Sequence, residues 1–375
     1  MNIGITCYPT YGGSGIVATE LGMELAARGH QVHFISYANP IRLAADSPGI
    51  HYHEVEVSTY PLFQYPPYSL ALASRMAEVA EAAGLDLLHV HYAIPHAISA
   101  MLAKLMLAGR RRLPFITTLH GTDITLVGAD RSYLPITKFS IEQSDGVTSI
   151  SRYLEERTRT VFGVASEIRV IHNFVNCRLY RRNPDPAARA VYAGPAQMIL
   201  VHLSNFRPVK RVLDVVRVFA RVRRDIPAKL LMIGDGPDRG PAEALARELG
   251  VEADAVFVGK QNRIPELLGV ADLMLLPSEH EAFGLAALEA MACGVPTVAA
   301  RTGGLPELIT DRIDGLMAPV GDIEAMAAHA LSLLGDSASW GRFSAAARLT
   351  AETRFSTDLI IPQYEEYYRR VLAEG

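Results

Sequence analysis

The sequence lacks several features that mark particular classes of protein. It has three cysteines, Cys7, Cys177 and Cys293, an odd number at wide spacing that indicates reduced thiols in a cytoplasm, not a disulfide framework. The start of the chain leads directly into an apolar strand, without the basic and apolar regions of an export signal. No apolar run approaches the roughly 18 residues that a membrane-spanning helix needs. We therefore expect a cytoplasmic protein that is not inserted in a membrane.

Strong charge is also missing. The formal net charge is −4, so nothing in the composition favours bulk binding of nucleic acid. His89, His91 and His96 lie close in sequence, with Asp86 as the only other candidate metal ligand nearby. Because zinc sites need three or four convergent ligands, we expect a structural or acceptor-binding role for this strand end and no metal site.

What the sequence does contain is a regular alternation of apolar strands and helices. A strand at Ile3–Cys7, a glycine-rich loop and a helix at Ile16–Arg28 open the chain, and a second series begins with the strand Met198–Leu203. Such alternation predicts α/β architecture with doubly wound parallel sheets, and 375 residues suit two domains. Two helical stretches, about Ile323–Leu334 and Ser337–Arg354, precede a final one at Asp358–Ala373.

The most informative stretch runs from Ser278 to Pro296. It follows an apolar strand and leads through a helix of small residues into another strand. In such units a ligand binds beyond the carboxyl end of the strand, where N–H groups at the helix start face an anion. The backbone amides of Phe283, Gly284 and Leu285 are therefore predicted to face something negative.

Two carboxylates, Glu281 and Glu289, flank this helix start. On a continuous helix they would lie about 12 Å apart along the axis, too far for the roughly 5 Å carboxylate pair of a retaining glycosidase. They must contact different parts of one long ligand, or different ligands. As isolated residues, both would more simply be solvated glutamates on a helix surface.

The spacing Glu-x7-Glu, followed by Ala-Met-Ala-Cys-Gly-Val-Pro, resembles the signature of the family-4 retaining glycosyltransferases. The resemblance implies the GT-B fold, in which two Rossmann-like domains face each other across a cleft and a C-terminal helix crosses back to the first domain. It implies an acceptor-binding domain at 1–173, a domain for the nucleotide sugar at 174–356, and a returning helix at 357–375. It also implies that Glu281 and His120 face the donor sugar and that Glu289 binds the ribose.

Three cations, Arg207, Lys210 and Arg211, follow the strand at Met198–Leu203. By resemblance Lys210 and an arginine neutralise the departing diphosphate, and we assign Arg207 while leaving the choice between Arg207 and Arg211 open. The predicted catalytic residues are thus His120, Arg207, Lys210 and Glu281. The predicted donor-binding residues are Gly13, Asn205, Arg263 at the uracil, Phe283, Gly284, Leu285 and Glu289.

Two motifs in the first third of the chain narrow the resemblance to one branch of the family. They are Tyr-Pro-Thr-Tyr-Gly-Gly-Ser-Gly and Thr-Thr-Leu-His-Gly-Thr-Asp-Ile-Thr. They resemble the branch of the family that transfers N-acetylglucosamine from UDP-N-acetylglucosamine to the hydroxyl of L-malate in bacillithiol biosynthesis. Malate, a small dicarboxylic acid, needs cations and hydrogen-bond donors, and we assign Ser14, Tyr92, Thr118 and Asn205 to it. No Asp-x-Asp motif occurs, so we expect no essential metal or other cofactor, with cations doing the work of a divalent ion.

Other functions stay open at this point. The acceptor could be a sugar, an inositol phosphate or a lipid, although no basic amphipathic membrane-docking helix stands out. A UDP-N-acetylglucosamine epimerase shares the two-domain architecture and needs no acceptor, and a non-catalytic binding protein is a third alternative. The sequence leaves the oligomeric state open, a homo-oligomer included, and does not reveal the extent of domain closure.

Overall fold

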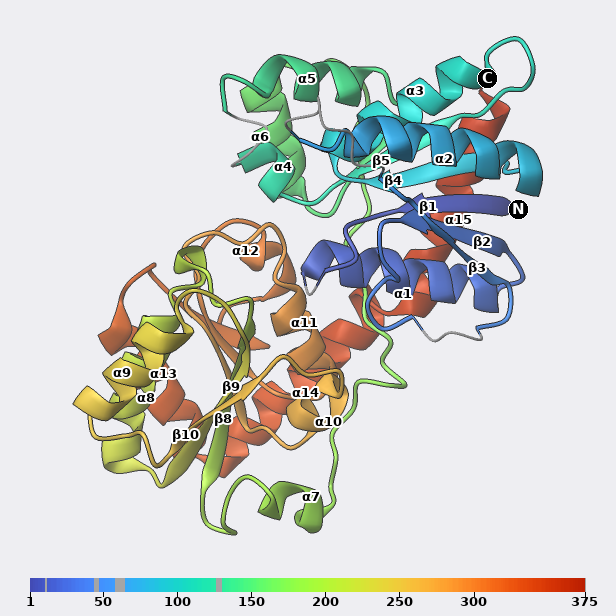
Figure 1. The fold of residues 1–375 in the computed structure, drawn as a ribbon. Coiled ribbons are helices and arrows are strands. Elements are labelled where there is room, and N and C mark those ends of the chain that lie inside the picture. Colours follow the sequence, from blue (N-terminus) through green and yellow to red (C-terminus); the bar gives the residue numbers. More distant parts are fainter. Residues whose placement is uncertain (11, 44–46, 58–64, 126–129, 375) are drawn as a thin grey trace. The chain divides into compact units, whose positions relative to one another are not determined.

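The computed structural model describes residues 1–10, 12–43, 47–57, 65–125 and 130–374, which form two compact units (Figure 1). The first unit contains Met1–Asn173 together with the chain from Ile360 onward, and the second contains Phe174–Leu359. Each unit has its own sheet and core, and each is described by itself below. No helix in the described part of the chain is long and apolar enough to cross a membrane.

The first unit is built on a seven-stranded parallel sheet with the order β3-β2-β1-β4-β5-β6-β7. Its central strands are buried because both faces are covered by helices. The strands are β1 (Asn2–Thr6), β2 (Gln31–Ser36), β3 (Ile50–Glu54), β4 (Leu87–His91), β5 (Phe115–Leu119), β6 (Gly146–Ser149) and β7 (Arg169–Val170).

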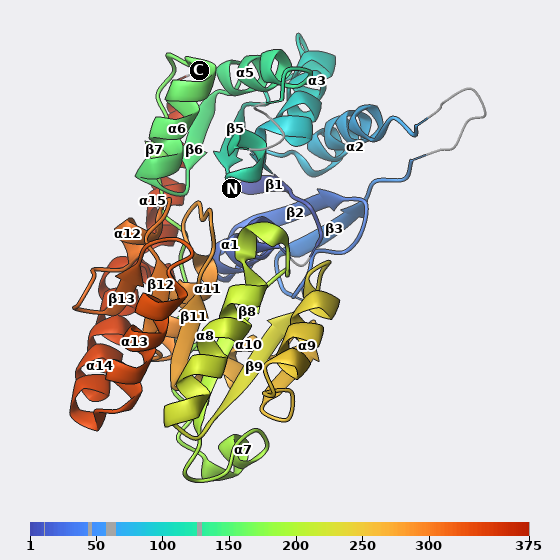
Figure 2. The ribbon, with the colours of Figure 1, turned by 90° about the vertical axis from the view of Figure 1, so that its left-hand side faces the viewer.

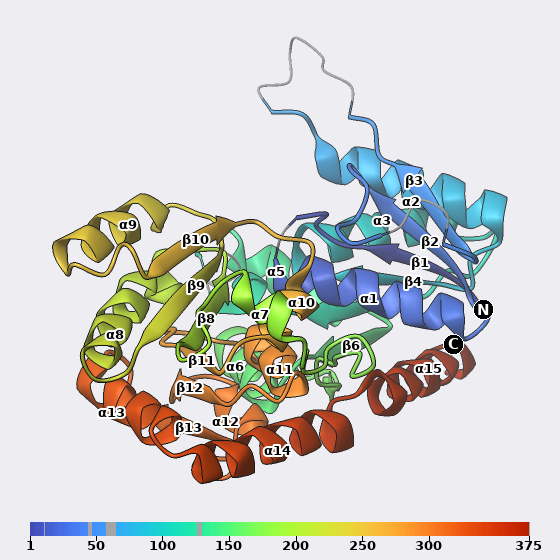
Figure 3. The same ribbon diagram turned by 90° about the horizontal axis from the view of Figure 1, so that it is seen from below.

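The helices of this unit lie on both faces of the sheet. α2 and α3 pack side by side over one face, where Leu88 and Val90 join their core (Figure 2). α1 and α15 lie on the other face (Figure 3). There His30, just after α1, bonds Glu365 of α15 at 2.8 Å. The helices are α1 (Gly13–Ala27), α2 (Tyr68–Ala83), the π-helical turn η1 (Ala93–Ala97), α3 (Ile98–Leu107), α4 (Thr122–Thr125), α5 (Leu134–Glu142), α6 (Arg152–Phe162) and α15 (Thr357–Ala373).

Helix α1 begins earlier than the sequence predicted, at Gly13 and not at Ile16. Gly12 is extended and its carbonyl accepts the first helical bond, from the amide of Ile16 at 3.1 Å. A Cβ on Gly15 would lie 2.5 Å from the carbonyl oxygen of Tyr8, so the first turn presses against the loop after β1. The glycines that looked like loop residues therefore form the first helical turn.

The second unit has a six-stranded parallel sheet with the order β10-β9-β8-β11-β12-β13. Its strands are β8 (Met198–Ser204), β9 (Ala228–Gly234), β10 (Ala255–Gly259), β11 (Leu273–Leu276), β12 (Thr297–Ala300) and β13 (Gly315–Ala318). Its helices are α7 (Pro186–Ala190), the 3-10 turn η2 (Pro208–Lys210), α8 (Val212–Asp225), α9 (Arg239–Glu248), α10 (Ile264–Gly269), α11 (Leu285–Ala292), α12 (Leu305–Leu308), α13 (Ile323–Leu334) and α14 (Ser337–Arg354).

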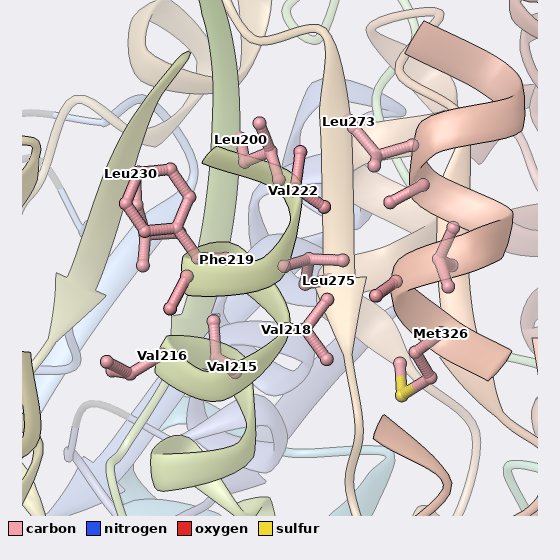
Figure 4. Packing of buried hydrophobic residues seen from close by; sticks show 14 of the residues in the cluster. Leu200, Val215, Val216, Val218, Phe219, Val222, Leu230, Leu273, Leu275 and Met326 are labelled. Carbon is pink, nitrogen blue, oxygen red and sulfur yellow. The ribbon is translucent and has the colours of Figure 1, made fainter. Parts of the chain in front are cut away.

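The core of the second unit forms where α8 and α13 lie over the sheet (Figure 4). Val215, Val218, Phe219 and Val222 recur at helical spacing along one side of α8, and all four are fully buried. Met326 of α13 joins the same core. Burying an apolar side chain of this size contributes about 1.5–3 kcal/mol, so this face of α8 fixes the helix and the loop before it.

Both sheets are doubly wound, as predicted. In each, the strand order reverses beside the first strand of the unit, between β1 and β4 and between β8 and β11. Ligands of open α/β sheets bind beyond the carboxyl ends of the strands at such a reversal. The predicted site residues Ser14 and Tyr92 follow β1 and β4, whereas Lys210 and Glu281 follow β8 and β11.

Candidate active site

In the second unit, the loop that follows β11 is braced from both sides. The amide of Glu279 donates to the carbonyl of Val209 at 2.8 Å, and the amide of Gly304 donates to the carbonyl of Glu281 at 2.9 Å. Gly303 has a φ of +56°, and a Cβ there would lie 1.9 Å from the Glu281 carbonyl oxygen, so only glycine fits. The loops after β8, β11 and β12 are thereby tied together.

Glu281 and Lys210 form an ion pair within this frame. Lys210 Nζ lies 2.6 Å from Glu281 Oε1, and the hydroxyl of Ser278 donates to the same oxygen at 2.9 Å. The Lys210 side chain is 21% exposed and that of Glu281 11%. The carboxylate is thus fixed by two donors, while the ammonium group has three N–H bonds to give.

The other two cations of the β8 loop differ in their surroundings. Arg211 has a φ of +50°, and its Nε donates to Asp214 of α8 at 2.6 Å. Arg217 pairs with the same carboxylate at 2.7 Å. Arg207 is exposed, and no ion pair of its side chain occurs among the residues that the structure describes. Arg211 is therefore held by its own helix, whereas Arg207 is the exposed cation beside Lys210.

The start of α11 presents backbone and not side chains. Gly284 precedes the helix with a φ of +99°, and a Cβ there would lie 2.5 Å from a methyl carbon of Leu305. The ring of Phe283 is buried and packs edge-on against Phe355, with ring centroids 5.4 Å apart. The helix begins at Leu285, and the first amides of a helix have no intrahelical partner.

Glu289 lies on the buried side of α11, with only 3% of the residue exposed. The hydroxyl of Tyr180 donates to its Oε1 at 2.6 Å. Tyr180 is itself 1% exposed and is separated from Glu289 by 109 positions in the sequence. A buried carboxylate needs such donors, because an unsatisfied one is costly.

Asn205 and Arg263 complete the predicted donor side. Asn205 directly follows β8, and its side-chain oxygen is buried without a hydrogen-bond partner in the described part of the chain. The backbone of this turn is tightly packed as well, because a Cβ on Gly236 would lie 2.2 Å from the backbone carbonyl oxygen of Asn205. Arg263 is exposed at the start of α10 and pairs with Glu266 of the same helix at 3.1 Å.

In the first unit, a hydrogen bond joins the two loops at the reversal of strand order. The hydroxyl of Ser14, in the first turn of α1, donates to the hydroxyl of Tyr92 at 3.0 Å. Tyr92 directly follows β4 with a φ of +87°, which is strained for a residue other than glycine. Its amide donates to the carbonyl of Thr118 at 2.9 Å. Gly13 is exposed beside Ser14.

Thr118 points into the interior of this unit. Its fully buried hydroxyl lies 2.7 Å from His89 Nε2 and 2.6 Å from the hydroxyl of Thr148. The other imidazole nitrogen of His89 bonds the hydroxyl of Tyr368 on α15 at 2.7 Å. Burial lowers the pKa of His89 to about 3, so the imidazole is neutral near pH 7. Thr118 therefore belongs to a buried network beneath the site loops.

His120 lies just past β5 and contacts a second histidine. Its Nε2 is 2.7 Å from His91 Nδ1, and burial, reinforced by neighbouring histidines, lowers the pKa of His120 to about 3. Asp123 holds the turn, because its carboxylate accepts from the amides of His120, Gly121 and Ala93. Burial raises the pKa of Asp123 to about 6, against the effect of these amides.

Two family profiles cover most of the chain. The profile of "Glycosyltransferase Family 4" matches residues 11–179, and that of "Glycosyl transferases group 1" matches residues 189–350. Over 375 residues the chain is 47% identical to the N-acetyl-alpha-D-glucosaminyl L-malate synthase of Bacillus anthracis, covering 100% of this chain and 98% of that protein. The chain belongs to glycosyltransferase family 4.

A more distant relative in sequence and a solved structure also match nearly the whole chain. The D-inositol 3-phosphate glycosyltransferase of Mycobacterium avium is 26% identical over 396 residues, covering 97% of this chain and 91% of that one. The solved structure of Alr3699/HepE from Anabaena, in complex with UDP and glucose, superposes with a TM-score of 0.83 at 21% identity, over 98% of this chain and 99% of that one. The GT-B fold inferred from the sequence is therefore confirmed.

The structure groups the predicted site residues of this glycosyltransferase by unit. Lys210 and Glu281 meet directly, whereas Arg263 and Thr118 are held by partners of their own. Sequence reasoning missed Ser278, Tyr180 and His91 as partners of Glu281, Glu289 and His120. Only Ser278 carried a usable signal, because it lies three residues before Glu281. Among the described residues no group of three or more His, Cys, Asp or Glu side chains is arranged to hold a metal.

Proposed function

We propose that this glycosyltransferase transfers N-acetylglucosamine from UDP-N-acetylglucosamine to the hydroxyl of L-malate, with retention of the α configuration. The observation that carries the proposal is the 47% identity along the full chain with the Bacillus anthracis protein of that name. The match to a relative named for an inositol phosphate acceptor is much lower, at 26%. We therefore favour malate over that acceptor.

The proposed donor site is in the second unit. Glu289 receives the ribose hydroxyls, Arg263 lies at the uracil, and Asn205 offers a side-chain amide whose oxygen has no described partner. Gly13 is assigned to the donor as well. The backbone around Phe283, Gly284 and Leu285, at the start of α11, faces the diphosphate, since a helix N-terminus favours negative charge.

The proposed transfer step needs charge stabilisation more than acid or base chemistry. The bond from the anomeric carbon to the β-phosphate oxygen breaks, and the malate hydroxyl oxygen bonds the same carbon on the same face. The hydroxyl proton passes to the departing phosphate oxygen, so no enzyme base is required. Lys210 and Arg207 stabilise the growing negative charge on UDP, while Glu281 and His120 orient the sugar.

The proposed acceptor site is in the first unit. Ser14 and Tyr92 carry hydroxyls that already bond each other at the loop tips, and both residues are half-buried. A dicarboxylate is bound more tightly when several donors form hydrogen bonds to it, and the hydroxyls of Ser14 and Tyr92 can each donate to one carboxylate oxygen. The buried Thr118 supports the loop that carries Tyr92 through its carbonyl. Asn205, which belongs to the second unit, is also assigned to the acceptor.

We further propose that the reaction needs no metal or organic cofactor and takes place in the cytoplasm. Lys210 and Arg207 supply the positive charge that a divalent ion would supply in other transferases. All three cysteines, Cys7, Cys177 and Cys293, are free thiols, as a reducing compartment favours.

The proposal is tested by following UDP release from UDP-N-acetylglucosamine with a panel of acceptors. The panel contains L-malate, D-malate, succinate, which lacks the hydroxyl, and inositol 3-phosphate. We expect rapid release with L-malate alone and competitive inhibition by succinate. Faster release with inositol 3-phosphate would refute malate as the acceptor, and release independent of any acceptor would refute transfer as the main reaction.

A further inference from the structure

A buried hydrogen bond joins the predicted ribose ligand to a residue outside the motifs of the sequence. Tyr180 lies in the segment between Phe174 and α7, where the second unit begins, and its hydroxyl donates to Glu289 Oε1 at 2.6 Å. The two residues are 1% and 3% exposed. A hydrogen bond between groups buried this deeply is electrostatically stronger than the same bond in water.

The backbone around both residues is clamped by one guanidinium group. Arg348 of α14 donates from Nη1 to the carbonyl of Tyr180 at 2.6 Å and also to the carbonyl of Ala292, at the end of the helix that carries Glu289. Its Nη2 donates to the carbonyl of Cys177 at 2.8 Å. The segment of Tyr180 and the last turn of α11 are therefore fixed to the same side chain.

We propose that Tyr180 is a positioning residue for nucleotide binding, which holds the Glu289 carboxylate in the orientation that receives the ribose hydroxyls. This inference rests on the ribose role of Glu289 in the proposed function. A glutamate carboxylate has about four acceptor positions, so it can accept from a tyrosine hydroxyl and from ligand hydroxyls at the same time. Fixing the side chain beforehand removes the rotamer entropy that binding would otherwise cost.

The bond from Tyr180 also helps to stabilise a carboxylate at a buried position. Glu289 lies on a helix whose other buried residues are all apolar, namely Ala287, Leu288, Ala290, Met291 and Ala292. Without a donor, an ionised group there would be expensive. Arg348 donates to backbone carbonyls and to Glu352. The Tyr180 hydroxyl thus donates to Glu289, while Arg348 holds the backbone that carries Tyr180.

The test is calorimetric binding of UDP and of 2′,3′-dideoxy-UDP to the full-length protein and to Tyr180→Phe. Wild type is expected to bind the dideoxy ligand about tenfold more weakly than UDP, because two hydroxyls lose a charged acceptor. In Tyr180→Phe we expect UDP affinity to fall by about tenfold and the discrimination between the two ligands to shrink to about twofold. In turnover, the KM for the donor should rise while kcat changes little.

A matched control is Tyr367→Phe in the first unit, which also removes a buried tyrosine hydroxyl, one that bonds the backbone of Val147. It should lower the melting temperature without changing UDP affinity. Glu289→Gln and the double variant complete the set. If Tyr180 acts through Glu289, the double variant binds UDP no more weakly than Glu289→Gln alone.

The outcomes separate the inference from the proposed function. If wild type binds UDP and 2′,3′-dideoxy-UDP equally, Glu289 does not receive the ribose hydroxyls, and the proposed role of Tyr180 is refuted as well. Discrimination in wild type that survives undiminished in Tyr180→Phe, or losses that add in the double variant, would overturn the inference and leave the ribose assignment standing.

Discussion

Lys210 Nζ and Glu281 Oε1 are 2.6 Å apart, in an ion pair that links the 3-10 turn after β8 to the loop after β11. The two residues were assigned from the sequence to different parts of the donor, the diphosphate and the sugar. Their contact brings the two side chains together at one point of the second unit. A ligand that bonds both groups would lie with its sugar and diphosphate at this pair.

Replacing Lys210 by alanine should mainly slow the chemical step. Its charge matters most when the diphosphate departs, so we expect kcat to fall by about 100-fold or more with a smaller change in donor KM. Steady-state kinetics measures both. Lys229→Ala, which removes a lysine paired with Asp254, is the control and should keep wild-type kcat. An unchanged kcat in Lys210→Ala would contradict the proposed role of Lys210 in stabilising the departing diphosphate.

Replacing Glu281 by glutamine should distinguish a role in orienting the donor sugar from a role in binding the nucleotide. If Glu281 orients the donor sugar, kcat should fall by about tenfold or more while the inhibition constant of UDP, which has no sugar, stays within about twofold. Ser278→Ala, which removes the second donor to the same oxygen, should show a smaller effect of the same kind. Equal weakening of UDP and of the sugar donor would assign Glu281 to the diphosphate.

Tyr92→Phe and Ser14→Ala should act on the acceptor. Each removes one hydroxyl from the pair at the loop tips, and a lost hydrogen bond to a carboxylate costs about 1.5–3 kcal/mol, or about 10- to 100-fold in the KM for malate. Donor KM should change little in both variants. A variant that raised the donor KM and spared the malate KM would move these residues to the donor site.

Chelation should leave the activity intact. Because Lys210 and Arg207 are proposed to stabilise the negative charge on the leaving UDP, we expect the same rate in excess EDTA as in the presence of magnesium or manganese. The rate of UDP release after exhaustive dialysis is the measurement. Activity that disappears with the chelator and returns with either ion would refute metal independence.

Acid should destabilise the first unit before the second. The pKa of His89 and His120 is lowered to about 3 and that of His96 to about 4 by burial, and the pKa of His91 is also lowered. Below about pH 6.5 the unfolded chain binds more protons than the folded one, so stability falls as the pH drops toward 4, by up to about 1.4 kcal/mol per pH unit for each histidine.

Protonation of Asp123 has the opposite effect on the stability of the first unit. Its pKa is raised to about 6, so between about pH 6 and 4 the folded state takes up the proton and gains stability, which offsets about one histidine. In the second unit, burial lowers the pKa of His202 to about 4. Hydrogen exchange at pH 7 and pH 4.5, corrected for intrinsic rates, should show protection lost first in β4 and β5. Simultaneous loss in both units would contradict the account.

Much of the fold follows from local sequence. Helices α13 and α14 begin and end at the predicted residues, because Asp322 and Asp336 cap their first turns with side-chain hydrogen bonds. The alternating strands and helices predicted doubly wound sheets, and the order of strands agrees. α1 was wrong at its start, because glycines that suggest a loop instead allow the first turn to approach the carbonyl of Tyr8.

The site was less accessible from sequence, for a physical reason. Motifs gave candidate residues such as Glu281 and Glu289, but not their partners, because Tyr180 reaches Glu289 across 109 positions. The pairing of Arg211 with Asp214 was available in principle from its spacing of three residues. Contacts between distant segments depend on the sheet order, which no local pattern encodes.

Mass spectrometry of the product decides whether N-acetylglucosamine is transferred to malate. The purified protein is incubated with UDP-N-acetylglucosamine, with and without L-malate, and the mixture is analysed for UDP and for N-acetylglucosaminyl-malate. The account predicts that both products form only when malate is present, and that the anomeric proton of the isolated product shows the α configuration. Donor that stays intact in both mixtures, or a sugar product that contains no malate, would contradict it.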